Sequence, residues 1–308
     1  MFFRSIAVSL VLAALAIPHA ALGQEAWPQE CKLVRMLQLP MVAKGNHVGV
    51  SGSVNGKTVT LAIDTGGYAS ALTKTAADAL GLERHGLNLV TIRDMGGNFA
   101  NEYVHVDSFK VGNLRRDRVD LLVMEALPGF DGLIAPDFLR NYDAELDFGS
   151  GTFNLFKHHP CADHAIYWSG TYAVIPFSMT EDGHMRVPVT LDGHDTYAVL
   201  DTGAGVSALS MQSARRLFDI GEDSSDVKMA SQVTGASGSQ LKAYTYPFKT
   251  LIMGGLTVAN PRIELTEGSN FLGHNSASIL LGMDVLSKLH LYIAYHEQKL
   301  YISDAQAR

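Results

Sequence analysis

The sequence predicts an all-β protein made of two similar lobes that carry short helices. Three observations predict this class: a long internal repeat, β-rich segments that alternate with tight turns, and 29 glycines among 308 residues. Such a glycine content is typical of turn-rich β proteins. The hydrophobic fraction of 47% excludes a disordered chain, because it supplies enough apolar surface for a core.

The repeat relates residues 47–73 to residues 184–210, which align without a gap at an offset of 137 (47 to 184, 64 to 201). A second pair of similar segments, 129–156 and 276–303, shares an apolar run, an aspartate, a short helix and a closing hairpin. A duplication of this kind predicts two lobes about a pseudo-two-fold axis. The expected boundaries are lobes at 32–157 and 171–308 and a linker at 158–170.

In each copy, a turn dipeptide joins two strands. Asn55-Gly56 and Asp192-Gly193 are strong hairpin signals, because these residue types tolerate the positive φ that a two-residue turn needs. The second strand of each hairpin ends at an Asp-Thr-Gly triplet. A short helix is expected after each triplet, with caps at Thr73 and Ser210 and stops at Gly81 and Gly221.

Two further aspartates, Asp137 and Asp284, lie just before apolar helical residues in the shared tail. We interpret them as helix caps, since aspartate is a favoured residue at that position. Between the triplet and the tail, each copy has a glycine-rich turn between strands, near Gly96 and near Gly235.

The triplets are Asp64-Thr65-Gly66 and Asp201-Thr202-Gly203. One such triplet alone is typical of an ordinary turn, but two in matched contexts predict that Asp64 and Asp201 face each other at the axis. The glycines would let the backbone turn tightly there. Two close carboxylates share one proton over a range of pH, so the pair is both an acid and a base. The chemistry that follows is amide hydrolysis by an activated water, with no cofactor and no metal.

These motifs resemble those of the bilobed aspartic proteases, in a style between pepsin and the retroviral proteases, and are most similar to the exported bacterial members. The resemblance covers 47–157 and 184–303, including "LIA" at 133–135 and "LLG" at 280–282. It implies two β-barrel lobes with the active site in the cleft between them. It also implies an aspartic endopeptidase whose substrate is a peptide or protein.

The resemblance implies a role for each motif residue. The catalytic pair would be Asp64 and Asp201, and the hydroxyls of Thr65 and Thr202 would cross-brace the two loops that Gly66 and Gly203 complete. A substrate-binding flap would lie at one of two places in the chain, Gly96-Gly97 or Gly235 to Gly238.

The sequence departs from the family pattern next to the triplets. Gly67 and Ala204 stand where pepsin has a serine that binds a carboxylate oxygen, and Ala135 replaces a glycine at a close crossing of two segments. Tyr68 is bulky where its counterpart is Gly205, and it either shapes one side of the cleft or fills the core. The alternative function, supported by these departures, is a catalytically silent peptide- or protein-binding module.

The N-terminus reads as a signal peptide over residues 1–23. Arg4 precedes an apolar run from Ile6 to Ile17, Pro18 ends the run, and small residues precede Gln24. The run is too short to span a bilayer, and an uncleaved anchor is the alternative. We therefore expect a periplasmic or secreted protein with no stable membrane insertion after signal removal.

The only cysteines are Cys31 and Cys161, one on each side of the first lobe. In an oxidising compartment such a pair favours a disulfide, and two free thiols are the alternative. The histidines around Cys161 lack the spacing of a metal site. The net charge of −7 comes without a basic stripe, which argues against a nucleic-acid partner. We expect a monomer with two pseudo-symmetric lobes.

Overall fold

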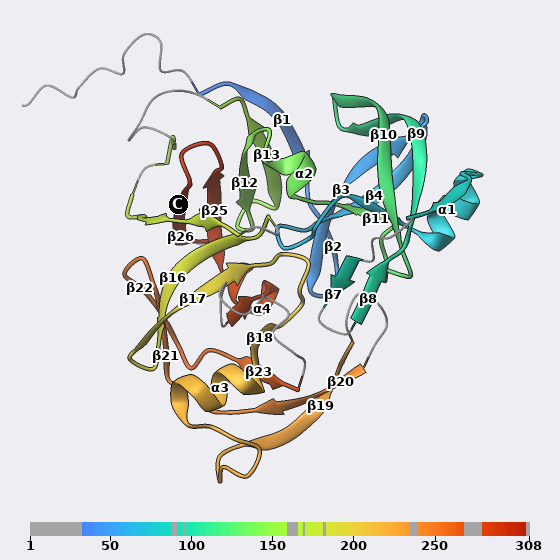
Figure 1. The fold of residues 1–308 in the computed structure, drawn as a ribbon. Helices are drawn as coiled ribbons and strands as arrows, with labels where there is room; N and C mark the ends of the chain where they lie inside the picture. The colour runs from blue at the N-terminus through green and yellow to red at the C-terminus, as the bar shows by residue number, and fades with distance from the viewer. Residues whose placement is uncertain are drawn as a thin grey trace, which may run out of the picture. The chain divides into compact units, whose positions relative to one another are not determined.

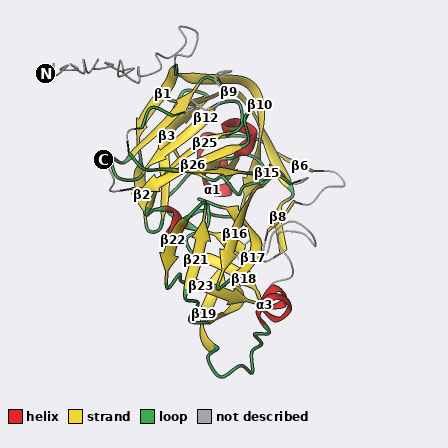
Figure 2. Ribbon diagram, turned by 90° about the vertical axis from the view of Figure 1, so that its left-hand side faces the viewer, coloured by secondary structure: helices red, strands yellow, loops and turns green. Residues whose placement is uncertain are grey.

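The computed structural model describes residues 33–87, 92–94, 97–158, 166–168, 170–180, 183–234, 240–267 and 279–305. The predicted signal peptide and the predicted Cys31–Cys161 disulfide lie outside these ranges. Strands make up most of the described chain, and the helices are short (Figure 2). None of the helices in this part of the chain has the length and hydropathy needed to cross a membrane.

The first half of the chain forms an eight-stranded sheet in the order β2-β3-β4-β11-β5-β10-β9-β6. Figure 1 labels β2, β3, β4, β9, β10 and β11 of this sheet. An additional pairing of β3 with β9 closes the sheet on itself, and its inner face buries Val50, Leu61 and Val104. The strands span Val42–Lys44 (β2), His47–Val54 (β3), Lys57–Ile63 (β4), Ala71–Thr73 (β5), Arg84–Gly86 (β6), Glu102–Val111 (β9), Leu114–Met124 (β10) and Gly132–Ile134 (β11).

The second half forms a ten-stranded sheet with the path β19-β20-β23-β18-β24-β17-β16-β21-β22, and β15 pairs with β16 beside it. The strands span Ser178–Met179 (β15), Met185–Leu191 (β16), His194–Leu200 (β17), Ser207–Ser210 (β18), Lys228–Thr234 (β19), Gln240–Thr245 (β20), Thr250–Met253 (β21), Leu256–Ala259 (β22), Ile263–Thr266 (β23) and Ile279–Leu281 (β24).

The centre of each sheet follows the same pattern. In the first half, β11 lies between β4, to which it runs parallel, and β5, to which it runs antiparallel. In the second half, β24 lies in the same way between β17 and β18. In each half, a strand from later in the chain therefore lies between two strands that are neighbours in sequence. The loop between those two strands contains the triplet.

A third, six-stranded sheet joins the halves in the order β1-β13-β12-β25-β26-β14. Strand β12 of the first half pairs with β25 of the second, with Ala144 opposite Ile293. The two closing hairpins of the repeat are thus one continuous sheet. The strands span Arg35–Pro40 (β1), Asp143–Asp147 (β12), Thr152–Phe156 (β13), Ala173–Pro176 (β14), Leu289–Ala294 (β25) and Lys299–Asp304 (β26).

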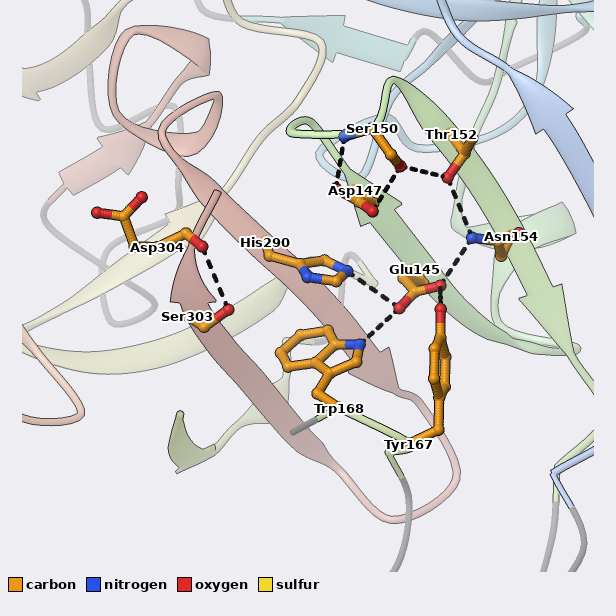
Figure 3. Close-up of polar contacts among 10 residues, drawn as sticks. All are labelled: Glu145, Asp147, Ser150, Thr152, Asn154, Tyr167, Trp168, His290, Ser303 and Asp304. Atoms are coloured by element: carbon orange, nitrogen blue, oxygen red, sulfur yellow. Dashed lines mark hydrogen bonds and ion pairs between the residues drawn. The ribbon is translucent and has the colours of Figure 1, made fainter. Parts of the chain in front are cut away.

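One face of this sheet packs in the core, and the other carries a fully buried carboxylate, Glu145 (Figure 3). The segment that follows the first half lies over this face and donates two hydrogen bonds to Glu145, from Tyr167 Oη (3.0 Å) and Trp168 Nε1 (2.7 Å). Asn154 and His290 supply two more contacts, at 2.7 and 3.0 Å. Four polar groups therefore surround one carboxylate.

The predicted hairpin turns are confirmed. Asn55 and Gly56 have φ of 49° and 81°, and Asp192 and Gly193 have φ of 45° and 83°. Two successive positive values define the turn that matches the twist of the adjoining strands. The flanking residues pair as the turn requires, with Val54 opposite Lys57.

The helices confirm three of the four predicted ends. Helix α1 (Lys74–Leu80) is capped by the Thr73 hydroxyl and ends at Gly81, and helix α3 (Met211–Phe218) is capped by Ser210. The predicted stop at Gly221 is wrong, because Asp219 already adopts the left-handed conformation (φ 56°). Aspartate is one of the few residues other than glycine that adopts it.

The prediction that Asp137 and Asp284 cap helices is also wrong. Helices α2 (Pro136–Leu139) and α4 (Met283–Leu286) have Ala135 and Gly282 at the cap position, without a side-chain cap. Both aspartates lie inside the first turn and bind a segment distant in sequence.

Candidate active site

The two candidate catalytic aspartates lie at equivalent places, directly after β4 and β17. The Asp64 backbone N–H donates to the Ile134 carbonyl (3.0 Å), and the Asp201 N–H donates to the Leu281 carbonyl (2.9 Å). The inserted strands β11 and β24 therefore hold the first residue of each triplet. Both residues are half-buried.

The threonines of the two triplets are joined by four hydrogen bonds. The Thr65 hydroxyl donates to the Leu200 carbonyl (2.8 Å) and accepts from the Thr202 N–H (3.1 Å). The Thr202 hydroxyl donates to the Ile63 carbonyl (2.7 Å) and accepts from the Thr65 N–H (3.1 Å). Both side chains are only 1% exposed, so water does not compete with these bonds. The two triplet loops are cross-braced at the base.

The triplet glycines bring each loop against the opposite aspartate. A Cβ at Gly66 would lie 2.6 Å from Oδ1 of Asp201, and one at Gly203 would lie 2.6 Å from Oδ2 of Asp64. Neither glycine has a positive φ. The close approach therefore requires glycine at both positions, and Gly66 and Gly203 each lie in a turn, as predicted.

The two carboxyls lie close enough for each to shift the pKa of the other. Burial raises the pKa of Asp64 well above its usual range, and the charge of Asp201 raises it further. Burial also raises the pKa of Asp201, against hydrogen bonds from Asp64 and from the backbone of Gly203 that lower it. The pair thus holds one proton to a higher pH than free aspartates do.

Two departures from the family pattern, at residue 67 and at residue 135, lie against each other. The second half has the same two residue types at the equivalent positions, in the opposite order. In the first half residue 67 is glycine and residue 135 is alanine, and a Cβ at Gly67 would lie 3.2 Å from the Ala135 Cβ. In the second half the alanine is Ala204 and the glycine is Gly282, where a Cβ would lie 2.6 Å from the Val206 carbonyl oxygen and 2.8 Å from the Ala204 carbonyl oxygen. Each crossing therefore contains one alanine and one glycine.

No serine hydroxyl is available at positions 67 and 204. The backbone N–H groups of the triplet glycines instead donate to the carboxylates, Gly66 to Asp64 Oδ1 (3.0 Å) and Gly203 to Asp201 Oδ1 (2.8 Å), and backbone hydrogen bonds of this kind lower the pKa of each carboxyl. The hydrogen bond that pepsin makes with a side chain is thus partly replaced by the main chain.

A second symmetric contact behind the triplets was not predicted from the sequence. The Ser70 N–H and hydroxyl both donate to Asp137 Oδ1 (2.9 and 2.8 Å), and the Ser70 hydroxyl accepts from the Ala135 N–H (3.1 Å). Ser207 makes the same contacts with Asp284 and Gly282. The signal was in the repeat, because both serines and both aspartates occupy equivalent positions.

Paired strands flank the two places where a flap is predicted. Strands β7 (Ile92–Asp94) and β8 (Gly97–Ala100) pair with each other, and Gly97 is the first residue of β8. In the second half, β19 and β20 pair on either side of residues 235–239. Gly96, Gly235 and Gly238 lie outside the described residues, and their role stays a prediction.

Tyr68 lies two residues after Gly66. Its side chain is 55% exposed, so the interpretation that it fills the core is wrong. Its neighbour Gly67 lies against the Asp64 carboxylate, since a Cβ there would be 2.9 Å from Oδ2. An exposed aromatic side chain therefore follows directly after the glycine that lies against Asp64.

The aspartyl protease family model matches residues 50–138 and 187–285, which together are more than half of the chain. Each match contains one triplet and ends within α2 or α4. The chain therefore belongs to the aspartyl protease family, and its predicted two-lobed all-β fold is confirmed. A search of curated proteins returns no significant match.

Proposed function

We propose that this protein is an aspartic endopeptidase that hydrolyses peptide bonds with a water activated by Asp64 and Asp201. The observation that carries the proposal is the meeting of the two triplet loops. Each triplet glycine lies against the opposite aspartate, and the two threonines fasten the loops together.

The chemistry follows from one shared proton. The ionised carboxylate takes a proton from a water molecule, whose oxygen attacks the carbonyl carbon of the scissile bond. The protonated carboxyl donates its proton to the carbonyl oxygen, which gives a neutral tetrahedral diol. Proton transfer to the nitrogen then breaks the C–N bond and releases a carboxylic acid and an amine. No covalent intermediate forms with the enzyme.

The electrostatics support this division of roles. A pair with raised pKa values keeps one proton in mildly acidic solution, so one member acts as base while the other acts as acid. Activity requires the singly protonated pair. We therefore expect cleavage to be favoured at acid pH and to fall as the shared proton is lost.

The test is cleavage of a diverse peptide library between pH 3 and pH 8, with and without a statine-type inhibitor. Asp64→Asn and Asp201→Asn should each reduce kcat by at least about 10³-fold, because removing one member of a catalytic unit removes most of its effect. The control is Asp107→Asn, at an exposed position on β9, which should cleave like the wild type.

Wild-type-like cleavage by either triplet variant would contradict the proposal. Peptide binding without cleavage at any pH in this range would instead favour the binding module, since the fold alone does not determine turnover.

A further inference from the structure

The shared six-stranded sheet carries a row of carboxylates that the proposed function does not use. Asp143, Glu145 and Asp147 alternate along β12 with Ala144 and Leu146, which pack in the core. Residues two apart on a strand lie on the same face, so the three carboxylates share the polar face of the sheet. Asp143 and Glu145 are buried there. Buried carboxylates destabilise a fold unless positive charge compensates them.

Each of the two buried carboxylates has a histidine as a partner. His158 Nδ1 lies 2.8 Å from Asp143 Oδ1, and His290 Nε2 lies 3.0 Å from Glu145 Oε1. Each contact is an ion pair only while its histidine is protonated. Histidine is the side chain that ordinarily changes its charge between about pH 5 and pH 8. The charge of this face therefore depends on pH within that range.

Fixed charges near the network do not replace the histidines. The other charged or titratable groups of the elements packed here are Arg35 (β1), Asp147 (β12), Tyr292 (β25), His296 and Glu297 (the turn after β25) and Asp304 (β26). Arg35 is the one permanent cation in this group, and its guanidinium lies over the Tyr167 ring, 5.9 Å from the centroid. Three of the group are further carboxylates.

Three parts of the chain meet at Glu145 (Figure 3): β12 of the first half, His290 on β25 of the second half, and linker residues Tyr167 and Trp168. The Trp168 indole stacks on the His290 ring, with the centroids 3.9 Å apart and the planes at 29°. A protonated imidazole is attracted both by the carboxylate and by the indole face. Burial and the charge of Glu145 raise the pKa of Tyr167 to about 12, so its hydroxyl remains a donor at neutral pH.

We propose that His158 and His290 make this network a pH-sensitive clasp, which holds residues 166–168 against the β12–β25 junction when the histidines are protonated. In mildly acidic solution each histidine compensates one buried carboxylate. As pH rises through the range in which histidine loses its proton, Asp143 and Glu145 become uncompensated buried charges and the clasp loosens. None of these residues belongs to the candidate active site, so the clasp does not depend on the proposed function.

The test measures how accessible Trp168 is to acrylamide between about pH 5 and pH 8. Trp27→Phe leaves Trp168 as the only tryptophan, because the sequence has two. The measured quantity is the quenching constant divided by the fluorescence lifetime, since a protonated His290 can itself shorten the lifetime. In this background, accessibility should rise by about twofold or more across the range, as local opening exposes the indole.

Variants assign the change to its histidines. His290→Gln keeps a hydrogen-bond donor but has no charge, so Trp168 should be accessible throughout the range. His158→Gln should reduce the pH-dependent change. The matched control is His105→Gln, which alters a histidine–aspartate pair whose side chains are 62% and 60% exposed, and it should keep the full change.

Equal accessibility of Trp168 at both ends of the pH range would overturn the proposal. A full pH-dependent change that persists in both His290→Gln and His158→Gln would also overturn it, because another group would then be responsible. If far-UV circular dichroism shows that His290→Gln does not fold, His158→Gln and the pH profile of the Trp27→Phe protein decide the question.

Discussion

At the residue scale, each half of the site has one alanine and one glycine where two segments cross. The pairs are Gly67 with Ala135 and Ala204 with Gly282. The second crossing is the tighter one, because the Met283 N–H donates to the Ala204 carbonyl (2.8 Å). Its counterpart in the first half is Pro136, which has no N–H to donate. A missing backbone hydrogen bond thus accompanies the extra methyl of Ala135.

This exchange predicts that Gly67→Ala destabilises the protein by about 1 to 3 kcal/mol, the usual effect of a methyl group added to a close-packed site. The new Cβ would lie 2.9 Å from Asp64 Oδ2 and 3.2 Å from the Ala135 Cβ. Adding Ala135→Gly should recover at least half of the loss. The free energy of unfolding in urea measures both effects.

The control for this cycle is Gly86→Ala, because a Cβ at Gly86 would meet no atom of the described chain within 4 Å. Its effect should stay within about 0.5 kcal/mol. If the losses from Gly67→Ala and Ala135→Gly simply add, the two positions are not coupled and the exchange is not compensatory.

Local features of single residues were predictable, but their distant partners were not. The Asn55-Gly56 turn and the Thr73 cap depend on neighbours in the chain, so the residue types alone indicate them. Asp137 has the same local signature as a cap, yet its carboxylate binds Ser70, which is 67 residues away. Nothing in the local pattern distinguishes these uses of an aspartate, and only the paired occurrence in the repeat marks it.

At the element scale, strand β12 shows how an alternating pattern misleads. Its sequence, DAELD, reads as a strand with one apolar face and one solvated face. The structure buries Glu145 completely, because residues 166–168 lie over the polar face (Figure 3). Burial of this carboxylate depends on a segment about 20 residues further along the chain, so the strand's own sequence does not reveal it.

The Glu145 contacts predict that Glu145→Gln destabilises the protein by about 3 kcal/mol, as expected when one partner of a buried polar network is changed. Both carboxylate oxygens face hydrogen-bond donors. The amide nitrogen of glutamine is itself a donor, so at least one of these groups loses its acceptor. Denaturant unfolding measures the loss, and near-UV circular dichroism should report the displaced Trp168.

The matched control is Glu125→Gln, which removes the charge of a 60% exposed side chain paired with Lys74. Its effect should be below about 1 kcal/mol, since exposed ion pairs contribute little. Equal stability of the Glu145→Gln protein and the wild type would show that the network does not hold residues 166–168 on the sheet.

At the scale of the whole described chain, the sequence predicted the duplication but did not predict how the two halves join. Equivalent triplets predicted that the two halves meet at an axis, and the threonine hydrogen bonds lie there. The shared six-stranded sheet was not predicted. No residue pattern in the two closing hairpins indicates that β12 and β25 pair with each other. Backbone pairing between β12 and β25 is independent of side-chain type, so sequence contains little trace of it.

The same axis predicts how stability changes with pH. The pKa values of Asp64 and Asp201 are raised in the folded protein, so the folded state binds more protons than the unfolded state above the ordinary value of 3.8. This contribution to stability is fully present below that value and is lost as pH rises through the folded pKa values. At neutral pH the close, partly buried charges therefore destabilise the fold.

Replacing one aspartate removes this repulsion. Asp64→Asn should raise the Tm by a few degrees at pH 7, where about 1 kcal/mol corresponds to a few degrees for a chain of this size. The gain should shrink as pH falls toward 4, because the wild-type pair is then protonated. Asp107→Asn, at an exposed site, should show no comparable gain. A Tm difference between Asp64→Asn and the wild type that is equal at pH 4 and pH 7 would show that the two carboxyls do not titrate as a strained pair.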